Sequence, residues 1–103
     1  MAKHISAQDA YQIMRNNKSA IVVDVRSRRE YETGYIPGAI SLPGYDITSK
    51  AEKTLPDLNA TILVYCQSGV RSRTASALLV SMGYTNVYNF GGINAWPYAR
   101  LVK

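Results

Sequence analysis

The most informative segment of this chain is Thr61-Ile62-Leu63-Val64-Tyr65-Cys66-Gln67-Ser68-Gly69-Val70-Arg71-Ser72-Arg73-Thr74-Ala75. Residues 61–65 form a short β-branched and apolar run, which is typical of a strand buried on both faces. From Ser72 to Met82 the apolar residues recur at helical spacing, and Gly83 follows where a helix can end. A tight loop that begins at Cys66 joins the two elements. The segment therefore predicts a strand, a loop and a helix in direct succession.

Cys66 is the only cysteine of the chain, and the predicted loop places it before the N-terminus of a helix. Unpaired backbone N–H groups and the positive end of the helix dipole stabilise a thiolate there. A free thiol with a pKa near 8.5 is only about 3% ionised at pH 7, and such a setting can lower that pKa by ~2 units. Gly69 permits a positive φ that turns successive amides inward, and Arg71 adds a cation. A buried cysteine with a packing role is the plainer alternative, and the loop composition argues against it.

The rest of the chain alternates between strand and helix patterns. Helices are expected from Ser6, as N-cap, through Arg15, over residues 28–33 before Gly34, and in a last helix containing Ile93, Trp96 and Leu101. Strands are expected over residues 21–25, 39–42 and 86–90. Residues 44–57 carry little pattern beyond a helical turn at 51–55, and Gly91-Gly92 reads as a turn. This alternation predicts an α/β fold with a mostly parallel central sheet and helices on both faces.

Length and composition limit the organisation and the function. The 103 residues suffice for a single domain, residues 1–103, and the one cysteine excludes an internal disulfide and a Cys-x-x-Cys site. The first residues lead directly into a helix, without an apolar signal core or a membrane-length run, so we expect a cytoplasmic protein with no membrane partner. The net charge of +5 is scattered, which favours small anionic substrates over nucleic acid. We expect neither a metal nor a cofactor.

Three segments resemble signatures of the rhodanese (thiosulfate sulfurtransferase) family. The loop from Cys66 to Ser72 resembles the family's active-site loop. Residues 24–40 are similar to the N-terminal signature, in which Asp-x-Arg precedes Glu-aromatic and Gly-aromatic-Ile-x-Gly-Ala. Gly83-Tyr84 and Gly91-Gly92-Ile93-Asn94-Ala95-Trp96 look like the C-terminal signature. The resemblance covers nearly the whole chain, with the three motifs in the family's order and spacing.

The resemblance implies a single rhodanese domain that moves sulfur in two steps. The Cys66 thiolate would take the outer sulfur of thiosulfate, or of another donor, and pass it from a persulfide to cyanide or a thiol. Inward amides of the loop would hold the anion, and Arg71 would bind the sulfonate oxygens. The substrate-binding residues would be Gln67, Ser68, Gly69, Val70, Arg71 and Ser72. A supporting polar cluster is expected from Asp24, Arg26 and Glu30.

Two other functions remain open. A sulfur carrier would use the same loop to accept sulfur from a protein donor for tRNA or cofactor thiolation. Cysteine-dependent phosphatases and arsenate reductases use Cys-x5-Arg, and here Ser72 occupies the arginine position while Arg71 and Arg73 flank it. The loop is thus one residue short for a bound phosphate, which makes this second alternative the weaker one.

Overall fold

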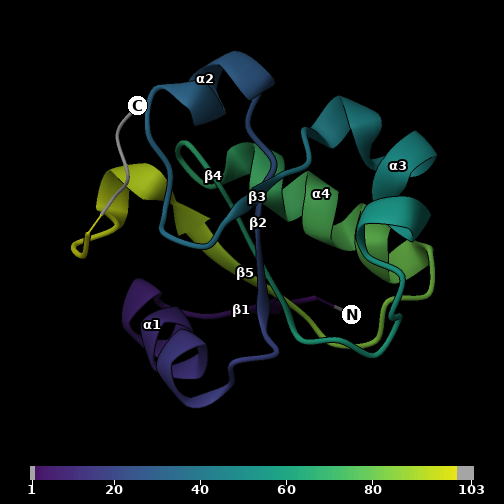
Figure 1. Ribbon diagram of the computed structural model, residues 1–103, viewed down its shortest axis with the longest axis horizontal. Helices are drawn as coiled ribbons and strands as arrows, with labels where there is room; N and C mark the ends of the chain where they lie inside the picture. Colours follow the sequence, from purple (N-terminus) through teal and green to yellow (C-terminus); the bar gives the residue numbers. More distant parts are fainter. Residues whose placement is uncertain (1, 100–103) are drawn as a thin grey trace.

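A sheet of five parallel strands lies at the centre of the computed structural model, which describes residues 2–99 (Figure 1). The strands are β1 (Lys3–His4), β2 (Ile21–Asp24), β3 (Ile40–Ser41), β4 (Ile62–Cys66) and β5 (Val87–Gly92). Their order across the sheet is β1-β5-β4-β2-β3, which puts β4 in the middle. Cys66 is the last residue of this central strand and lies at the carboxyl edge of the sheet, where ligands of open α/β sheets bind.

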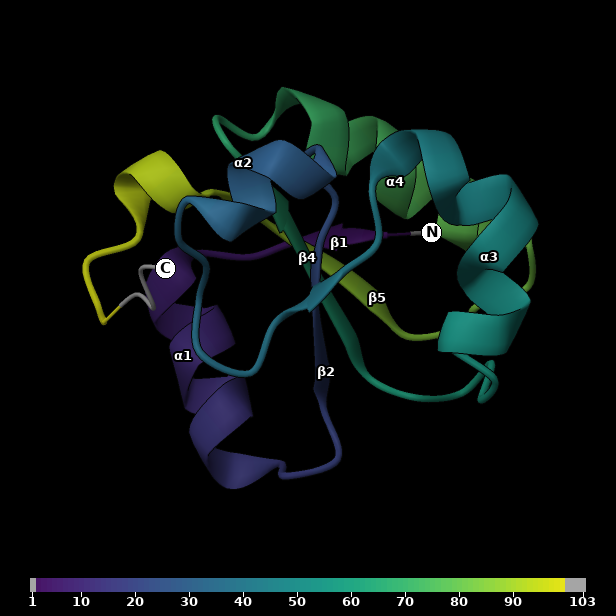
Figure 2. The ribbon, with the colours of Figure 1, turned by 45° about the horizontal axis from the view of Figure 1, so that its top comes forward.

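Helices cover both faces of the sheet (Figures 1 and 2). They are α1 (Ala7–Asn16), α2 (Arg28–Glu32), α3 (Ile47–Thr54) and α4 (Val70–Ser81), with short 3-10 turns η1 (Gly44–Asp46) and η2 (Ile93–Ala95). Buried residues of α3 and α4 share one apolar cluster, while α1 and η2 contribute to the other. The predicted α/β fold, with a parallel sheet between two layers of helices, is confirmed.

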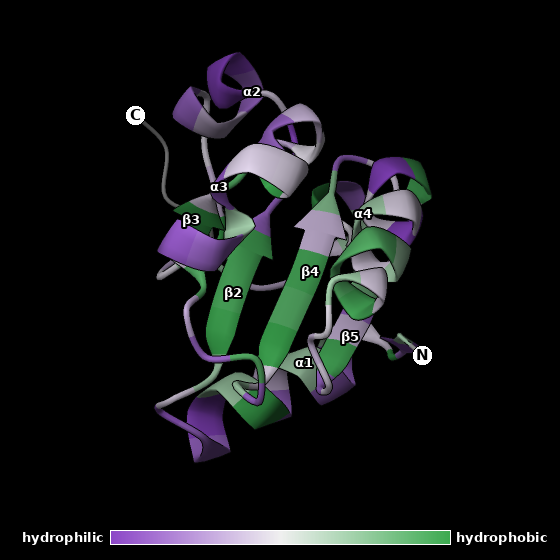
Figure 3. Cartoon of the chain, turned by 90° about the vertical axis from the view of Figure 1, so that its right-hand side faces the viewer, coloured by the Kyte–Doolittle hydropathy of each residue, from purple (hydrophilic) through white to green (hydrophobic). Residues whose placement is uncertain are grey.

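All five residues of β4 are fully buried, and their side chains alternate between the two apolar clusters. Ile62, Val64 and Cys66 pack on the side of α3 and α4, whereas Leu63 and Tyr65 pack on the side of α1. The apolar colour of β2 and β4 between their helices is visible in Figure 3. The thiol of Cys66 therefore faces the helix that follows it in the sequence, α4.

The sequence pattern misses β1 and most of α3. Lys3 and His4 pair in parallel with Tyr88 and Asn89 of β5, but both side chains are exposed, so no apolar run marks the strand. The structure extends the expected helical turn at 51–55 to an eight-residue helix, α3. Only Ile47 and Ala51 of that helix are buried, which is too short an apolar stripe to predict it.

The prediction of a last helix is wrong for the residues that the structure describes. Only the three residues of η2 are helical, and Trp96 is already extended, with φ −77° and ψ 112°. Pro97 explains this end, because proline disfavours the helical conformation in the residue before it. Gly91 and Gly92, expected as a turn, belong to β5. Leu101, the other residue placed in that helix, lies outside the described residues.

The longest helix within residues 2–99 is α4, with twelve residues. None of the described helices is long and apolar enough to cross a membrane.

Candidate active site

The loop after β4 wraps backbone N–H groups around the sulfur of Cys66. Gly69 has a φ of +103° and precedes the first residue of α4, Val70. This conformation lets the amide of Gly69 donate a hydrogen bond to Cys66 Sγ at 3.0 Å. The hydroxyl of Ser72 lies in the first turn of the same helix, 3.1 Å from the carbonyl oxygen of Gly69. The positive φ predicted for Gly69 is confirmed, and α4 begins two residues earlier than the apolar pattern suggested.

The pKa of the Cys66 thiol lies below its ordinary value, although the residue is completely buried. Burial raises this pKa, because the anion loses its hydration. Hydrogen bonding by the Ser72 hydroxyl and by the amides of Ser72, Gly69 and Ser68 lowers it by more. The loop therefore favours the thiolate, the form in which cysteine acts as a nucleophile.

We expect the thiol of the folded chain to be alkylated by iodoacetamide with a pH midpoint below ~8.5, the value of a free thiol. Ser72→Ala removes the side chain with the largest lowering effect and should move this midpoint upward. Ser68→Ala is the matched control, since it keeps the amide through which Ser68 acts. The measurement is the alkylation rate as a function of pH, followed by mass spectrometry. A wild-type midpoint at or above ~8.5 contradicts the account.

The loop packs closely against β5 because residue 92 is a glycine. The interpretation of Gly91-Gly92 as a turn does not predict this role. A Cβ built on Gly92 would lie 2.6 Å from the Cα of Ser68 and would also overlap the carbonyl group of Gln67. The amide of Asn94, just beyond β5, donates to the carbonyl oxygen of Gln67 at 3.2 Å. Gly92 thus supports the loop, and its place in the C-terminal motif is the sequence signal that indicates it.

Arg26 connects the end of β2 to the loop. Its guanidinium contacts both carboxylate oxygens of Asp24, the shortest contact being 2.7 Å, and its Nη1 donates to Gln67 Oε1 at 3.2 Å. Gln67 in turn donates through Nε2 to Asn94 Oδ1 at 2.7 Å. Asp24 and Arg26 are 0% and 3% exposed, so the ion pair is buried. Arg26 and Asn94 therefore hold the Gln67 side chain from both sides. Asn94 is not among the site residues predicted from the sequence.

Glu30 does not pair with Asp24 and Arg26, with which we had grouped it, but with Arg71. Its two carboxylate oxygens accept hydrogen bonds from Arg71 Nη1 and Nη2 at 2.7 and 2.8 Å. It also accepts from the backbone and hydroxyl of Ser27, the N-cap of α2. Arg71 and, to a lesser extent, Ser27 hold the pKa of Glu30 at about 2. The ion pair joins α2 to the rim of the loop and stays charged at neutral pH.

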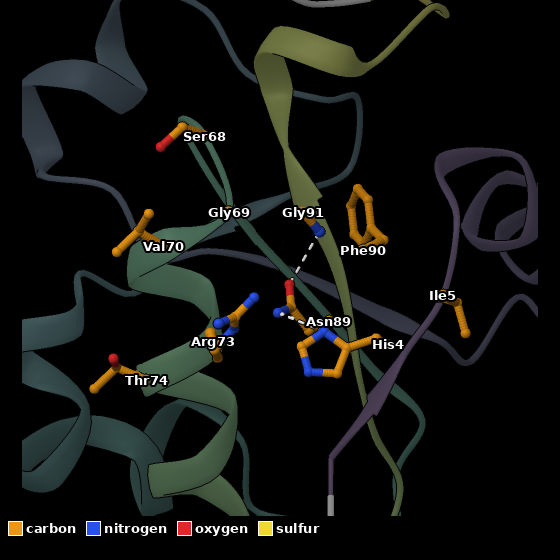
Figure 4. A pocket seen from close by; sticks show the side chains of 10 residues that line it. All are labelled: His4, Ile5, Ser68, Gly69, Val70, Arg73, Thr74, Asn89, Phe90 and Gly91. Carbon is orange, nitrogen blue, oxygen red and sulfur yellow. Dashed lines mark hydrogen bonds between the residues drawn. The ribbon is translucent and has the colours of Figure 1, made fainter.

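A polar cavity of about 440 Å³ runs along the loop on the side of β1 and β5 (Figure 4). Ser68 and Gly69 line it at one end, and Arg73 enters from α4. On the opposite wall, Asn89 accepts a hydrogen bond from the amide of Gly91 and lies 3.4 Å from the His4 ring. Cys66 is not among the residues that line this cavity.

The structure brings Cys66, Gln67, Ser68, Gly69, Val70 and Ser72 into one loop and helix start, with Arg71 at its exposed rim. Within residues 2–99, no group of three histidine, cysteine, aspartate or glutamate side chains is placed to hold a metal ion.

Comparison with known proteins agrees with these features. The family described as Rhodanese-like domain matches residues 6–99. The chain is 38% identical over 71 residues to thiosulfate sulfurtransferase PspE of Escherichia coli strain K12, covering 69% of this chain and 68% of that protein. It is 36% identical over 95 residues to thiosulfate sulfurtransferase GlpE of Pseudomonas entomophila, covering 91% and 84%. A solved structure, a rhodanese with anions from E. coli, matches with a TM-score of 0.76 and 32% identity, covering 82% of this chain and 99% of that one.

Proposed function

The chain belongs to the rhodanese family, and we propose that it is a thiosulfate sulfurtransferase that carries sulfur on Cys66. The observation that carries the proposal is that the loop after β4 donates hydrogen bonds to the buried sulfur of Cys66 and so keeps the pKa of this thiol below its ordinary value. Relatives named thiosulfate sulfurtransferase support the reaction type. The loop geometry supports the assignment of Cys66 as the nucleophile.

In the first half-reaction, the thiolate of Cys66 attacks the outer sulfur of thiosulfate. A bond forms between Sγ and that sulfur, the sulfur–sulfur bond of thiosulfate breaks, and sulfite leaves with the bonding electron pair. The product is a Cys66 persulfide, whose terminal sulfur is anionic. The inward N–H groups that favour the thiolate also favour this anion, because they are fixed by the loop before the reaction begins.

In the second half-reaction, a nucleophile takes the terminal sulfur. Cyanide attacks through carbon, the bond between Sγ and the terminal sulfur breaks, and thiocyanate leaves while Cys66 returns to the thiolate. A thiol acceptor reacts in the same way after losing its proton to the solvent. Over the two steps Cys66 returns to its starting thiolate, so the protein undergoes no net oxidation or reduction.

Arg71 is proposed to bind the sulfonate oxygens of thiosulfate. Glu30 occupies two of its five N–H groups, and three remain for the donor. A charge-assisted bidentate contact contributes roughly 1.5–3 kcal/mol. We therefore expect Arg71→Ala to lower kcat/KM for thiosulfate by roughly ten- to a hundredfold. Arg71→Lys should recover only part of this, because an ammonium group lacks the planar pair of donors.

Steady-state kinetics with thiosulfate varied at saturating cyanide measures this effect. Arg73→Ala is the matched control, because it removes the same charge from the same helix while Arg73 points into the polar cavity instead (Figure 4). If Arg71→Ala keeps more than half of the wild-type kcat/KM, the backbone amides alone bind the donor and the role of Arg71 is wrong.

The experiment that tests the proposed activity is thiocyanate production from thiosulfate and cyanide, beside hydrolysis of p-nitrophenyl phosphate and reduction of arsenate. We expect turnover in the first assay only. The position that Cys-x5-Arg requires is held by Ser72, which is buried and whose hydroxyl lies 3.1 Å from the carbonyl oxygen of Gly69 and 3.3 Å from that of Gly91. Phosphatase activity without thiocyanate production would overturn the proposal. A persulfide that forms but reacts only with a protein acceptor would favour the sulfur carrier.

A further inference from the structure

The polar cavity on the side of β1 and β5 contains a cation but no acidic group. Arg73 reaches into it from α4, and none of the residues that line it is an aspartate or a glutamate (Figure 4). Within residues 2–99, the guanidinium of Arg73 has neither a hydrogen bond nor an ion pair with another protein group. A cation without a protein counter-charge, at the wall of a hollow that lacks carboxylates, attracts an anion.

Asn89 of β5 adds a donor whose direction is fixed. The residue is only 3% exposed, and its Oδ1 accepts a hydrogen bond from the amide of Gly91 at 3.0 Å. Because a backbone N–H can only donate, this bond identifies the oxygen of the side-chain amide and puts Nδ2, with its two N–H groups, on the opposite side. There Nδ2 lies 3.4 Å from Nδ1 of His4. At least one N–H of this nearly buried amide therefore remains for a ligand, although buried donors are normally paired.

His4 of β1 supplies a second oriented donor. Nδ1 of its ring faces an N–H of Asn89, so in the neutral ring Nδ1 accepts and Nε2 carries the proton. In Figure 4, Nε2 faces the space between β1 and α4, which Arg73 enters from the other wall. The parallel pairing of β1 with β5 places His4 beside Asn89. The sheet thus holds both donors on the same side of the cavity.

Three donors from three elements converge on this cavity, namely Arg73 of α4, Asn89 of β5 and His4 of β1. Such groups bind oxyanions, and the guanidinium offers two parallel N–H groups to a phosphate, sulfate or carboxylate. The volume of about 440 Å³ exceeds what the anionic group alone fills. It falls within the roughly 300–1,000 Å³ of sites that take small organic molecules.

We propose that this cavity is a second binding site, for an oxyanion that is either free or the anionic group of a small molecule. The guanidinium of Arg73 pairs with the anion, while Nδ2 of Asn89 and Nε2 of His4 donate to its oxygens. The ligand is held without a covalent step. The inference goes beyond the proposed function, because neither Cys66 nor Arg71 lines the cavity.

The test is an NMR titration of the full, isotope-labelled chain at low ionic strength, without a sulfur donor. The probes are inorganic phosphate, glucose 6-phosphate and glucose. We expect phosphate to move the Nδ2 signals of Asn89 in a saturable way, because the anion takes up its remaining N–H. Glucose, which is uncharged, should leave these signals in place. Tighter binding of glucose 6-phosphate than of phosphate identifies a small molecule as the ligand, and binding of phosphate alone identifies a free ion.

Arg73→Ala should weaken phosphate binding by roughly tenfold or more, because a charge-assisted contact is lost. Arg73 is exposed, so this variant should fold as wild type does. Asn89→Asp keeps an acceptor for the amide of Gly91 but replaces the donor by a negative charge, and should abolish binding. Lys53→Ala is the matched control, since it removes the same charge from an exposed position on α3 outside the cavity. It should leave the affinity unchanged.

Unchanged Asn89 signals at millimolar phosphate, or equal affinity of Arg73→Ala and wild type, would overturn the second site. A response confined to residues 66–72 that Arg71→Ala removes would also overturn it, because the anion then binds in the loop around Cys66. Neither result bears on the proposed function, since no sulfur is transferred in the titration.

Discussion

Cys66→Ala and Cys66→Ser are expected to abolish thiocyanate production from thiosulfate and cyanide. The chain has one cysteine, so no other side chain can hold a persulfide. A serine hydroxyl in the same place does not ionise near neutral pH and cannot form the sulfur–sulfur bond. The rate of thiocyanate formation should fall to that of the uncatalysed reaction. The measurement is the amount of thiocyanate formed per amount of protein at saturating substrate concentrations.

The folded state of both variants is checked by circular dichroism and by thermal unfolding. Alanine and serine are close to cysteine in size, and the loop keeps its own backbone when it loses the sulfur that accepts from donors such as the amide of Gly69. Both variants should therefore fold as wild type does. Turnover above background in a folded Cys66→Ala variant would refute the assignment of the nucleophile.

Asp24→Ala should have the largest effect on stability, a loss of about 3–5 kcal/mol in the free energy of unfolding. The carboxylate is fully buried and accepts hydrogen bonds from the backbone N–H, Nε and Nη2 of Arg26. Without this carboxylate, the buried Arg26 guanidinium has lost the counter-charge with which it pairs. A buried charge without a counter-charge lowers the free energy of unfolding. Urea unfolding should show a midpoint lower by on the order of 2 M.

Glu32→Ala is the surface control for this prediction. Its ion pair with Arg28 is 3.6 Å long, and both side chains are more than half exposed. Its loss should cost about 0–1 kcal/mol. The double variant Asp24→Leu with Arg26→Met removes both charges and should be more stable than Asp24→Ala alone. It should still lose activity, because Gln67 loses the donor that Arg26 provides. An Asp24→Ala variant as stable as the Glu32→Ala variant would contradict the role of the buried pair.

The sequence predicted the central part of the fold because the physical signals there are local. A short run of β-branched and apolar residues is typical of a strand buried on both faces, and β4 is buried throughout. The glycine that follows Ser68 permits the positive φ by which the loop reaches Cys66. The proposed nucleophile, its loop and the parallel sheet could therefore be read from the order of residue types.

The remaining features depend on contacts between distant segments. Glu30 and Arg71 are 41 positions apart, and either could have paired with another charge. The short strand β1 exists because β5 offers an edge, and its own two exposed residues give no pattern. A groove lined by Tyr45 forms where η1 meets α4, which no local pattern in residues 44–57 indicates. Sequence reasoning located Cys66 and its loop, but not the cavities beside them.

The central claim, that Cys66 carries sulfur, is tested most directly by the intact mass of the protein after incubation with thiosulfate and removal of small molecules. We predict that the mass of the wild-type chain rises by one sulfur atom, that cyanide or a thiol reverses the change, and that Cys66→Ala shows no change. An unaltered wild-type mass under conditions that support thiocyanate production, or an equal increase in Cys66→Ala, would contradict the account.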